Sequence, residues 1–146
     1  MRIKAINSAP GYNVNVVLVE RVAKDILKKT GAGRLASLEI LFLGDKDIRG
    51  LNKRFKRRDR ATDVLSFESD DVASIAISLD TASRNAKAFG TLLHEEASRY
   101  IIHGILHLFG YDDDTRANRL RMSDREDRIL RSICLNTDLS KALTRR

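Results

Sequence analysis

The residues best suited to chemistry lie in one short stretch, which reads His-Gly-Ile-Leu-His-Leu-Phe-Gly-Tyr-Asp-Asp from His103 to Asp113. Positions i and i+4 of a helix share a face, so the imidazoles of His103 and His107 should point the same way. Gly110 can end that helix in a left-handed turn, after which Asp113 can return over the same face. Two imidazole nitrogens and one carboxylate oxygen suit zinc or a similar divalent ion. Three protein ligands leave a position open for water, as in catalytic metal centres.

A second feature is a run of positive charge at residues 53–60, Lys-Arg-Phe-Lys-Arg-Arg-Asp-Arg. The whole chain of 146 residues carries a formal net charge of +7, and this run concentrates part of it. Such a patch suits a polyanion, of which nucleic acid is the commonest in a cytoplasm. A solvated basic helix end is the simpler alternative. The candidate nucleic-acid contacts are Lys53, Arg54, Lys56, Arg57, Arg58 and Arg60.

Composition narrows the class of protein. The length suits one domain over residues 1–146 with a substantial core. No run approaches the ~18 apolar residues of a membrane span, and residues 1–7 lack the apolar segment of a signal peptide. Cys134 is the only cysteine, which excludes an intrachain disulfide and a cysteine-based metal cage. These features predict a cytoplasmic protein that does not act at a membrane.

The elements that must position these residues follow from periodicity. Strands are predicted at residues 2–7, 37–43, 62–68 and 74–79, the last two joined by a short hairpin at residues 69–71. Helices are predicted at residues 14–29, 45–55, 80–89, 92–109 and 122–135. This order predicts an α+β domain, with a small mixed sheet of about four strands, about five helices and the histidines on a central helix.

Several local expectations belong to these elements. Gly31 should stop the first helix, and Asp45 should cap the second, with Phe55 facing inward. Ser123 followed by Glu126 resembles a capping box at the start of the last helix. The tail after residue 136 is expected to be frayed.

The histidine stretch closely resembles the signature of the YbeY family of bacterial rRNA endoribonucleases. Two further segments are similar to that family: Leu-Phe-Leu-Gly-Asp-Lys-Asp-Ile-Arg-Gly-Leu-Asn-Lys-Arg-Phe from Leu41, and Ala-Thr-Asp-Val-Leu-Ser-Phe from Ala61. The resemblance covers roughly residues 38–131. It implies a metal-dependent endoribonuclease specific for single strands, which acts in 3′-end maturation of small-subunit rRNA and in ribosome quality control. It also implies one divalent metal ion, with zinc favoured, and the small ribosomal subunit or its proteins as partners.

The chain departs from the family pattern at functional positions. The first two metal histidines carry over to His103 and His107, but the third falls at Asp113, which should make the site harder and more anionic. The family's functional arginine falls at Lys56, which keeps the charge and loses the bidentate fork; Arg57 is a possible substitute. Ser74 stands where the family usually has an aspartate, and Ala61 where it commonly has proline.

Two questions stay open at this level. Asp112 and Asp114 flank Asp113, and a shift of one residue in the turn would present either of them instead. Glu96 lies two turns before His103 and is a candidate hydrogen-bond partner for an imidazole N–H, or a plain surface carboxylate.

Three classes of function remain. In the first, an endoribonuclease, Lys56 would stabilise the transition-state charge, and Asp63 or Ser66 would orient water or simply hydrogen-bond at a strand edge. A zinc peptidase shares the ligand spacing, but Gly104 stands where those enzymes carry their glutamate base. The third class is a catalytically weakened module that only binds rRNA or the ribosome.

Overall fold

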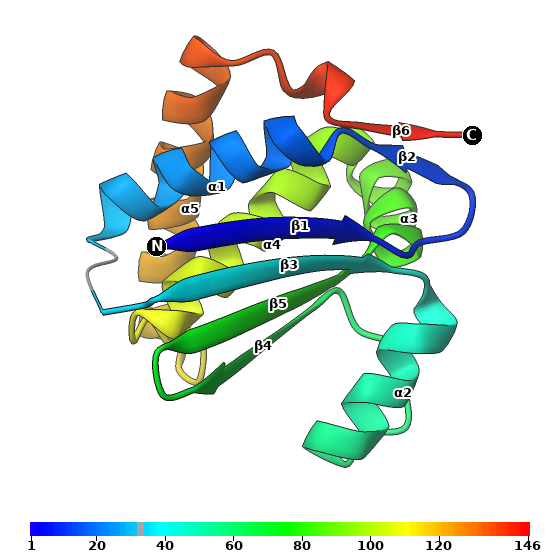
Figure 1. Ribbon diagram of the computed structural model, residues 1–146, viewed down its shortest axis with the longest axis horizontal. Coiled ribbons are helices and arrows are strands. Elements are labelled where there is room, and N and C mark those ends of the chain that lie inside the picture. The colour runs from blue at the N-terminus through cyan, green and yellow to red at the C-terminus, as the bar shows by residue number, and fades with distance from the viewer. Residues whose placement is uncertain (32–33) are drawn as a thin grey trace.

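The computed structural model describes residues 1–31 and 34–146 (Figure 1). Its elements, in chain order, are β1 (Arg2–Asn7), β2 (Tyr12–Val14), α1 (Val16–Thr30), β3 (Ser37–Leu43), α2 (Asp45–Lys56), β4 (Val64–Ser69), β5 (Val72–Ser78), α3 (Leu79–Phe89), α4 (Leu93–Leu108), α5 (Arg116–Asn136), a 3-10 turn η1 (Leu139–Lys141) and β6 (Leu143–Arg145). The α+β class, the four-stranded mixed sheet and the five helices confirm the prediction from sequence. None of the helices in the described ranges has the length and apolar character needed to cross a membrane.

The main sheet has the strand order β1-β3-β5-β4. β1 and β5 each run parallel to β3, while β4 runs antiparallel to β5. The predicted hairpin between β4 and β5 is confirmed: Ser69 faces Val72, and Asp70 turns the chain with a positive φ of 55°. β4 is therefore an outer strand of this sheet.

Alternation along the strands gives the sheet two apolar faces. On one face, Leu38, Ile40 and Phe42 of β3 join the main core, which α1, α4 and α5 complete. On the other face, Leu43 of β3 packs with Ile48 of α2 in a smaller cluster. The helix α4 contacts β4, β5, α1, α3 and α5, so the helix that carries the histidines is central, as predicted.

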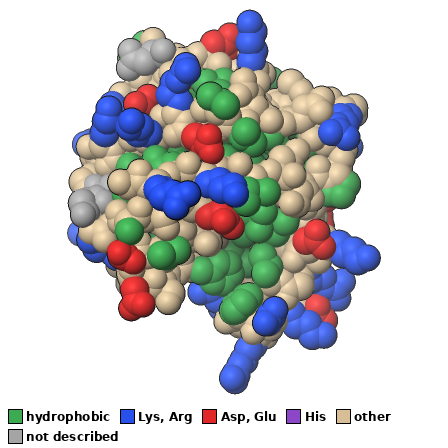
Figure 2. Space-filling model, viewed as in Figure 1, with side chains coloured by type: hydrophobic (Ala, Val, Ile, Leu, Met, Phe, Trp, Pro, Cys, Tyr) green, Lys and Arg blue, Asp and Glu red, His purple; other side chains and the backbone are tan. Residues whose placement is uncertain are grey.

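The face that carries α2 is only partly covered. α2 begins near the end of β3 and runs below the strands (Figure 1), and hydrophobic side chains gather on this face beside projecting Lys and Arg side chains (Figure 2). The prediction that Phe55 faces inward is wrong, because its side chain is 54% exposed. The buried side chains of α2 are those of Ile48 and Asn52, and Phe55 lies beyond them in the last turn of the helix.

Asp45 does not cap α2, contrary to the prediction, because the N-cap residue is Gly44. The Asp45 backbone N–H donates instead to Asp80 Oδ2 at 2.8 Å. The Asp45 carboxylate accepts from Ser78 Oγ at 2.7 Å, Thr81 Oγ1 at 2.8 Å and Arg84 Nη1 at 2.6 Å. Burial acts to raise the pKa of Asp45, but these three donors outweigh burial and hold that pKa below its usual value. This cluster joins the start of α2 to α3.

The tail after residue 136 is ordered, so the expectation of fraying is wrong. β6 pairs antiparallel with β2 in a second, two-stranded sheet, with Val14 opposite Leu143. Leu139, Ala142 and Leu143 are buried in the main core. Their apolar side chains offset the entropy lost when the tail becomes fixed.

The last helix also differs from its predicted start. α5 begins at Arg116, with Thr115 as N-cap, and the Thr115 hydroxyl accepts from the Asn118 backbone N–H at 3.1 Å. The Ser123–Glu126 pair is therefore no capping box, since both residues lie inside the helix. Gly31 ends α1 with a φ of 80°, as predicted.

Candidate metal and RNA site

The two histidines share one face of α4, as their spacing predicts. Their ring centroids are 6.4 Å apart, and the ring planes differ by 11°. His103 is partly buried and His107 is exposed. The His103 imidazole is thus partly enclosed by the protein, while the His107 imidazole beside it faces solvent.

Glu126 of α5 fixes the orientation of His103. Its carboxylate forms a short hydrogen bond with His103 Nδ1 and is itself buried. Arg99 lies beside the same carboxylate, with Nη1 3.7 Å from Glu126 Oε2. Burial acts to lower the pKa of His103, but the hydrogen bond and charge of Glu126, together with Asp63 and Asp113, outweigh burial and raise it. A carboxylate on Nδ1 selects the tautomer that leaves Nε2 free to bind a metal.

Sequence reasoning missed this contact, because Glu126 was assigned to a helix cap and Glu96 was considered as the imidazole partner. Glu96 instead accepts from Thr91 Oγ1 at 2.8 Å, near the start of α4. Glu126 lies 23 residues from His103 in sequence. Only the packing of α5 against α4 brings the two together.

The turn after α4 brings the carboxylates back toward the histidines. Gly110 has a φ of 90°, and its N–H donates to His107 O at 3.2 Å. The Tyr111 carbonyl lies 3.1 Å from His107 Nδ1, which orients that second ring. Asp113 Oδ2 then lies 3.7 Å from His103 Nε2. The predicted return of Asp113 over the histidine face is present in the structure.

Asp112 belongs to a second possible ligand group, which contains His107 and Asp113 but not His103. One ligand atom from each of His107, Asp112 and Asp113 lies within 4.8 Å of the others. Asp114 is directed elsewhere, since its Oδ1 accepts from the Asn118 side-chain amide at 2.8 Å. Two imidazoles with oriented rings and one or two carboxylates form a donor set that fits a divalent ion with mixed nitrogen and oxygen preference.

A hollow of about 220 Å³ connects His103, His107 and Asp113 to the basic run. Its lining residues are Lys56, Thr62, Asp63, Val64, Leu65, Ser66, His103, His107 and Asp113. The hollow therefore lies between α4 and the outer strand β4. Lys56 is the one member of the basic run that lines it, and Arg57 does not substitute for it there.

The remaining basic residues lie outside the hollow. Lys53 and Arg54 belong to the last turns of α2, and Arg57 ends that helix with a φ of 58°. The exposed basic residues outside the hollow are Lys53, Arg54, Arg57, Arg58 and Arg60. They form a charged surface that leads up to the site.

The polar side chains of Ser66 in β4, and of Asp63 just before it, already form hydrogen bonds within the protein. Ser66 Oγ donates to Gly104 O at 3.2 Å, which ties β4 to α4. Asp63 Oδ1 accepts from the Val64 N–H at 2.7 Å. Ser66 therefore bonds to a helix carbonyl and not at a strand edge, and Asp63 lines the hollow.

Gly104 explains why α4 can lie so close to the sheet. A Cβ at this position would be 2.8 Å from Ile75 Cγ2 of β5. A glutamate there would be directed into the core and not toward the histidines. The missing base of the peptidase alternative therefore has no room in this fold.

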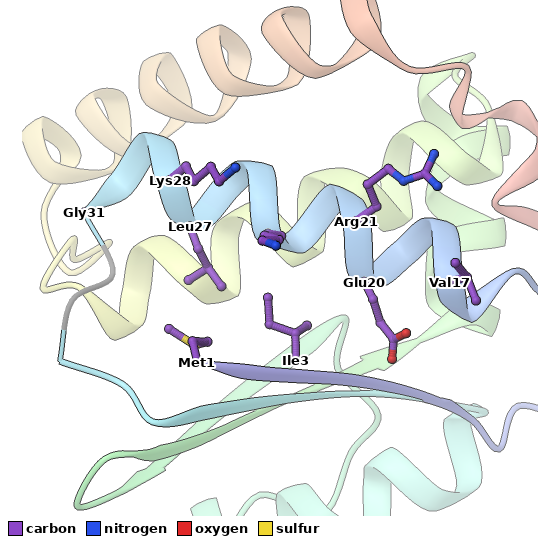
Figure 3. Close-up of a pocket in the computed structure, with 9 residues that line it drawn as sticks. Met1, Ile3, Val17, Glu20, Arg21, Leu27, Lys28 and Gly31 are labelled. Atoms are coloured by element: carbon purple, nitrogen blue, oxygen red, sulfur yellow. The ribbon is translucent and has the colours of Figure 1, made fainter.

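A larger hollow lies elsewhere and has different chemistry. It measures about 1030 Å³ and lies between β1 and α1 (Figure 3). Met1, Ile3 and Leu27 supply apolar surface, and Glu20 supplies a carboxylate. Glu20 Oε2 accepts from the Ala5 N–H at 3.0 Å, on the outer edge of β1. Among the described residues that line it there is no set of metal ligands, so the smaller hollow is the candidate site.

Comparison with known proteins agrees with the geometry. A family model described as "Endoribonuclease YbeY" matches residues 9–134. Endoribonuclease YbeY of Chlorobaculum parvum is 40% identical over 102 residues, which cover 67% of this chain and 72% of the relative. Endoribonuclease YbeY of a Chelativorans species is 34% identical over 136 residues, covering 86% and 83% respectively.

The lengths of the relatives differ. The chain spans about half of endoribonuclease YbeY of Anaeromyxobacter dehalogenans, with 40% identity over 104 residues that cover 54% of that relative. The solution structure of TM1509 from Thermotoga maritima has the same fold, with a TM-score of 0.65, 24% identity, and coverage of 90% of this chain and 88% of that one. On the family model and these relatives, the chain belongs to the endoribonuclease YbeY family.

Proposed function

We propose that this chain is a metal-dependent endoribonuclease that cuts single-stranded RNA. We assign it to the cytoplasm, to maturation of the small-subunit rRNA 3′ end and to ribosome quality control, with the small subunit or its proteins as partners. One observation carries the proposal. A single hollow is lined by His103, His107 and Asp113 and also by Lys56 from the basic run.

The metal ligands would be His103, His107 and Asp113, with Asp112 near enough to add a second carboxylate. A bound divalent ion, zinc in our proposal, would activate water or polarise a phosphate oxygen. Glu126 holds the His103 ring in the orientation that directs Nε2 toward Asp113. The Tyr111 carbonyl orients His107 from its Nδ1 side.

Lys56 supplies positive charge to the phosphate as negative charge develops in the transition state. It lines the same hollow as the histidines, and its Nζ lies 5.7 Å from the centroid of the Phe67 ring of β4. Loss of such a contact commonly lowers the rate on the order of 10²–10³-fold. The nucleophile is either water or the ribose 2′-OH, and the product ends distinguish the two, because only the second route leaves a cyclic phosphate.

The test begins with metal content and a cleavage assay on single-stranded RNA, with a duplex of the same sequence as comparison. Wild-type protein should bind close to one equivalent of metal and cut the single strand. His107→Ala should lose both properties, because the remaining ligands cannot hold the ion. An empty wild-type site after reconstitution with Zn²⁺, Mn²⁺ and Ni²⁺ would contradict the proposal.

A matched pair of basic variants separates catalysis from attraction. Lys56→Ala should lower the cleavage rate about 100-fold with little change in affinity. Arg60→Ala, outside the hollow, should mainly weaken binding and reduce the salt dependence of affinity by about one counterion. Equal losses of rate and affinity in both variants would show that the run is only an electrostatic surface.

A catalytically weakened binding module is the second candidate. The observation that favours it is the aspartate at the third ligand position, where Asp113 lies 3.7 Å from His103 Nε2. Metal-loaded wild-type protein that binds single-stranded RNA but leaves it uncut would establish this alternative.

A further inference from the structure

Phe55 is an exposed aromatic ring in the last turn of α2, although the sequence predicted an inward position. It does not stand alone. Phe67 of β4 meets it edge to face, with ring centroids 5.2 Å apart and planes at 61°. Phe67 is partly buried against the cluster of Leu43, Ile48 and Leu65, so it braces Phe55 from the sheet side. Leu51 and Ala61 also pack against this cluster.

Positive charge surrounds the two rings. The guanidinium carbon of Arg54 lies 5.2 Å from the Phe55 centroid. Lys56 Nζ lies 5.7 Å from the Phe67 centroid. Lys56 also lines the hollow that contains the histidines. The rings are therefore linked to the candidate metal site by a residue that contacts both.

This arrangement differs from an ordinary exposed phenylalanine. Phe89, at the end of α3, is 68% exposed and has no aromatic neighbour or cation over its ring among the contacts of the described residues. Phe55 combines an exposed ring, a second ring in edge-to-face contact with it, and two cations near the rings. Proteins that hold single-stranded nucleic acid combine the same parts, namely aromatic faces for bases and a cationic path for the backbone.

We infer that Phe55, braced by Phe67, is a stacking site for one unpaired nucleobase of an RNA strand whose neighbouring phosphate faces Lys56. This inference rests on the proposed function for the identity of the ligand. Every base has a flat π-face, so the site tolerates any sequence. It selects single strands, because a base within a duplex is already stacked and paired.

The chain has no tryptophan, so Phe55→Trp introduces one reporter at the site. The probes are a short single-stranded RNA with 2′-O-methyl riboses, its duplex, and the same strand with abasic positions. Metal-loaded protein is used, and gels verify that each probe stays intact. Indole fluorescence of Phe55→Trp should be quenched by the single strand and far less by the abasic strand. Phe89→Trp, the matched control, should not respond.

Affinity measurements complete the test. Phe55→Ala should weaken single-strand binding on the order of ten-fold, and Phe55→Leu should weaken it similarly, because leucine is apolar but not flat. Phe55→Trp should bind at least as well as wild type, and Phe89→Ala should be unchanged. Thermal unfolding of each variant confirms that the exposed substitution leaves the fold intact.

Three results would overturn the inference: wild-type affinity for Phe55→Leu, equal affinity of wild type for normal and abasic strands, or no binding of RNA by wild type. Failure of the proposed function gives a different experimental result. A protein whose Phe55→Trp fluorescence responds to bases, but which never cuts RNA, keeps the stacking site and loses the nuclease activity.

Discussion

Replacing Gly104 by alanine should leave the protein no more stable than wild type, although alanine favours helices. Gly104 lies within α4, where the helix crosses β5. An added Cβ would be 2.8 Å from Ile75 Cγ2, 3.0 Å from Cδ1 and 3.2 Å from Cγ1. Ile75 is fully buried, so it has little space to move into. Either the isoleucine leaves its preferred rotamer or α4 shifts away from the sheet.

Gly50 provides the matched control. It also lies inside a helix, α2, but a Cβ there would have no atom within 4 Å. Replacing glycine by alanine at an uncrowded helix position raises the free energy of unfolding by about 1 kcal/mol. Overpacking a core position lowers the free energy of unfolding by about 1–3 kcal/mol. The helix gain is common to both variants, so their free energies of unfolding should differ by about 1–3 kcal/mol, with Gly50→Ala above wild type and Gly104→Ala at or below it.

Urea unfolding, followed by circular dichroism in the presence of a chelator, measures the difference without a contribution from metal binding. The midpoints should be separated by about 1 M if the slopes are equal. In an Ile75→Ala background, Gly104→Ala should regain the helix benefit, because the three crowded atoms are absent. If Gly104→Ala stabilises the wild-type protein as much as Gly50→Ala does, α4 does not lie against β5 as described.

Three further predictions concern the site and its support. Glu126→Ala should weaken metal binding about 10- to 100-fold, because the His103 ring loses the carboxylate that orients it; competition with a chelating dye measures this, and equal affinity would exclude the role. Asp113→His should tighten zinc and Asp113→Ala weaken it, with Asp112→Ala as the comparison; the same titration identifies which carboxylate binds. Asp45→Asn should cost about 1–2 kcal/mol at pH 7, since three donors face its carboxylate. The pKa of Asp45 is lowered by folding, so this stability is present above the unfolded value of 3.8 and is lost as the pH falls through the folded value; unfolding curves that keep the full difference at pH 2 would contradict it.

Local sequence signals predicted much of the site. The spacing of His103 and His107 set their common face, and Gly110 set the turn that returns Asp113. These relations depend on a few consecutive residues whose geometry the helix and the turn determine. The β4–β5 hairpin could be predicted for the same reason.

Contacts between distant segments could not be predicted in this way. Glu126 meets His103 only because α5 packs on α4, and the short-range pattern Ser-x-x-Glu suggested a cap instead. Pairing of β6 with β2 joins residues 143–145 to residues 12–14. The helical period alone places the Phe55 ring on the apolar side, whereas in the fold the ring is exposed and meets Phe67 edge to face.

The position of the small hollow beside β4 determines how a polymer can enter it. In the described part of the chain, β4 has a strand neighbour on one side only, so the hollow opens at the rim of the sheet. An RNA strand can enter an open hollow from the side, without a free end, whereas a closed tunnel admits RNA only through a free end. A covalently closed circle of single-stranded RNA should therefore be accepted as readily as an open strand, and its first cut should yield one linear molecule of full length.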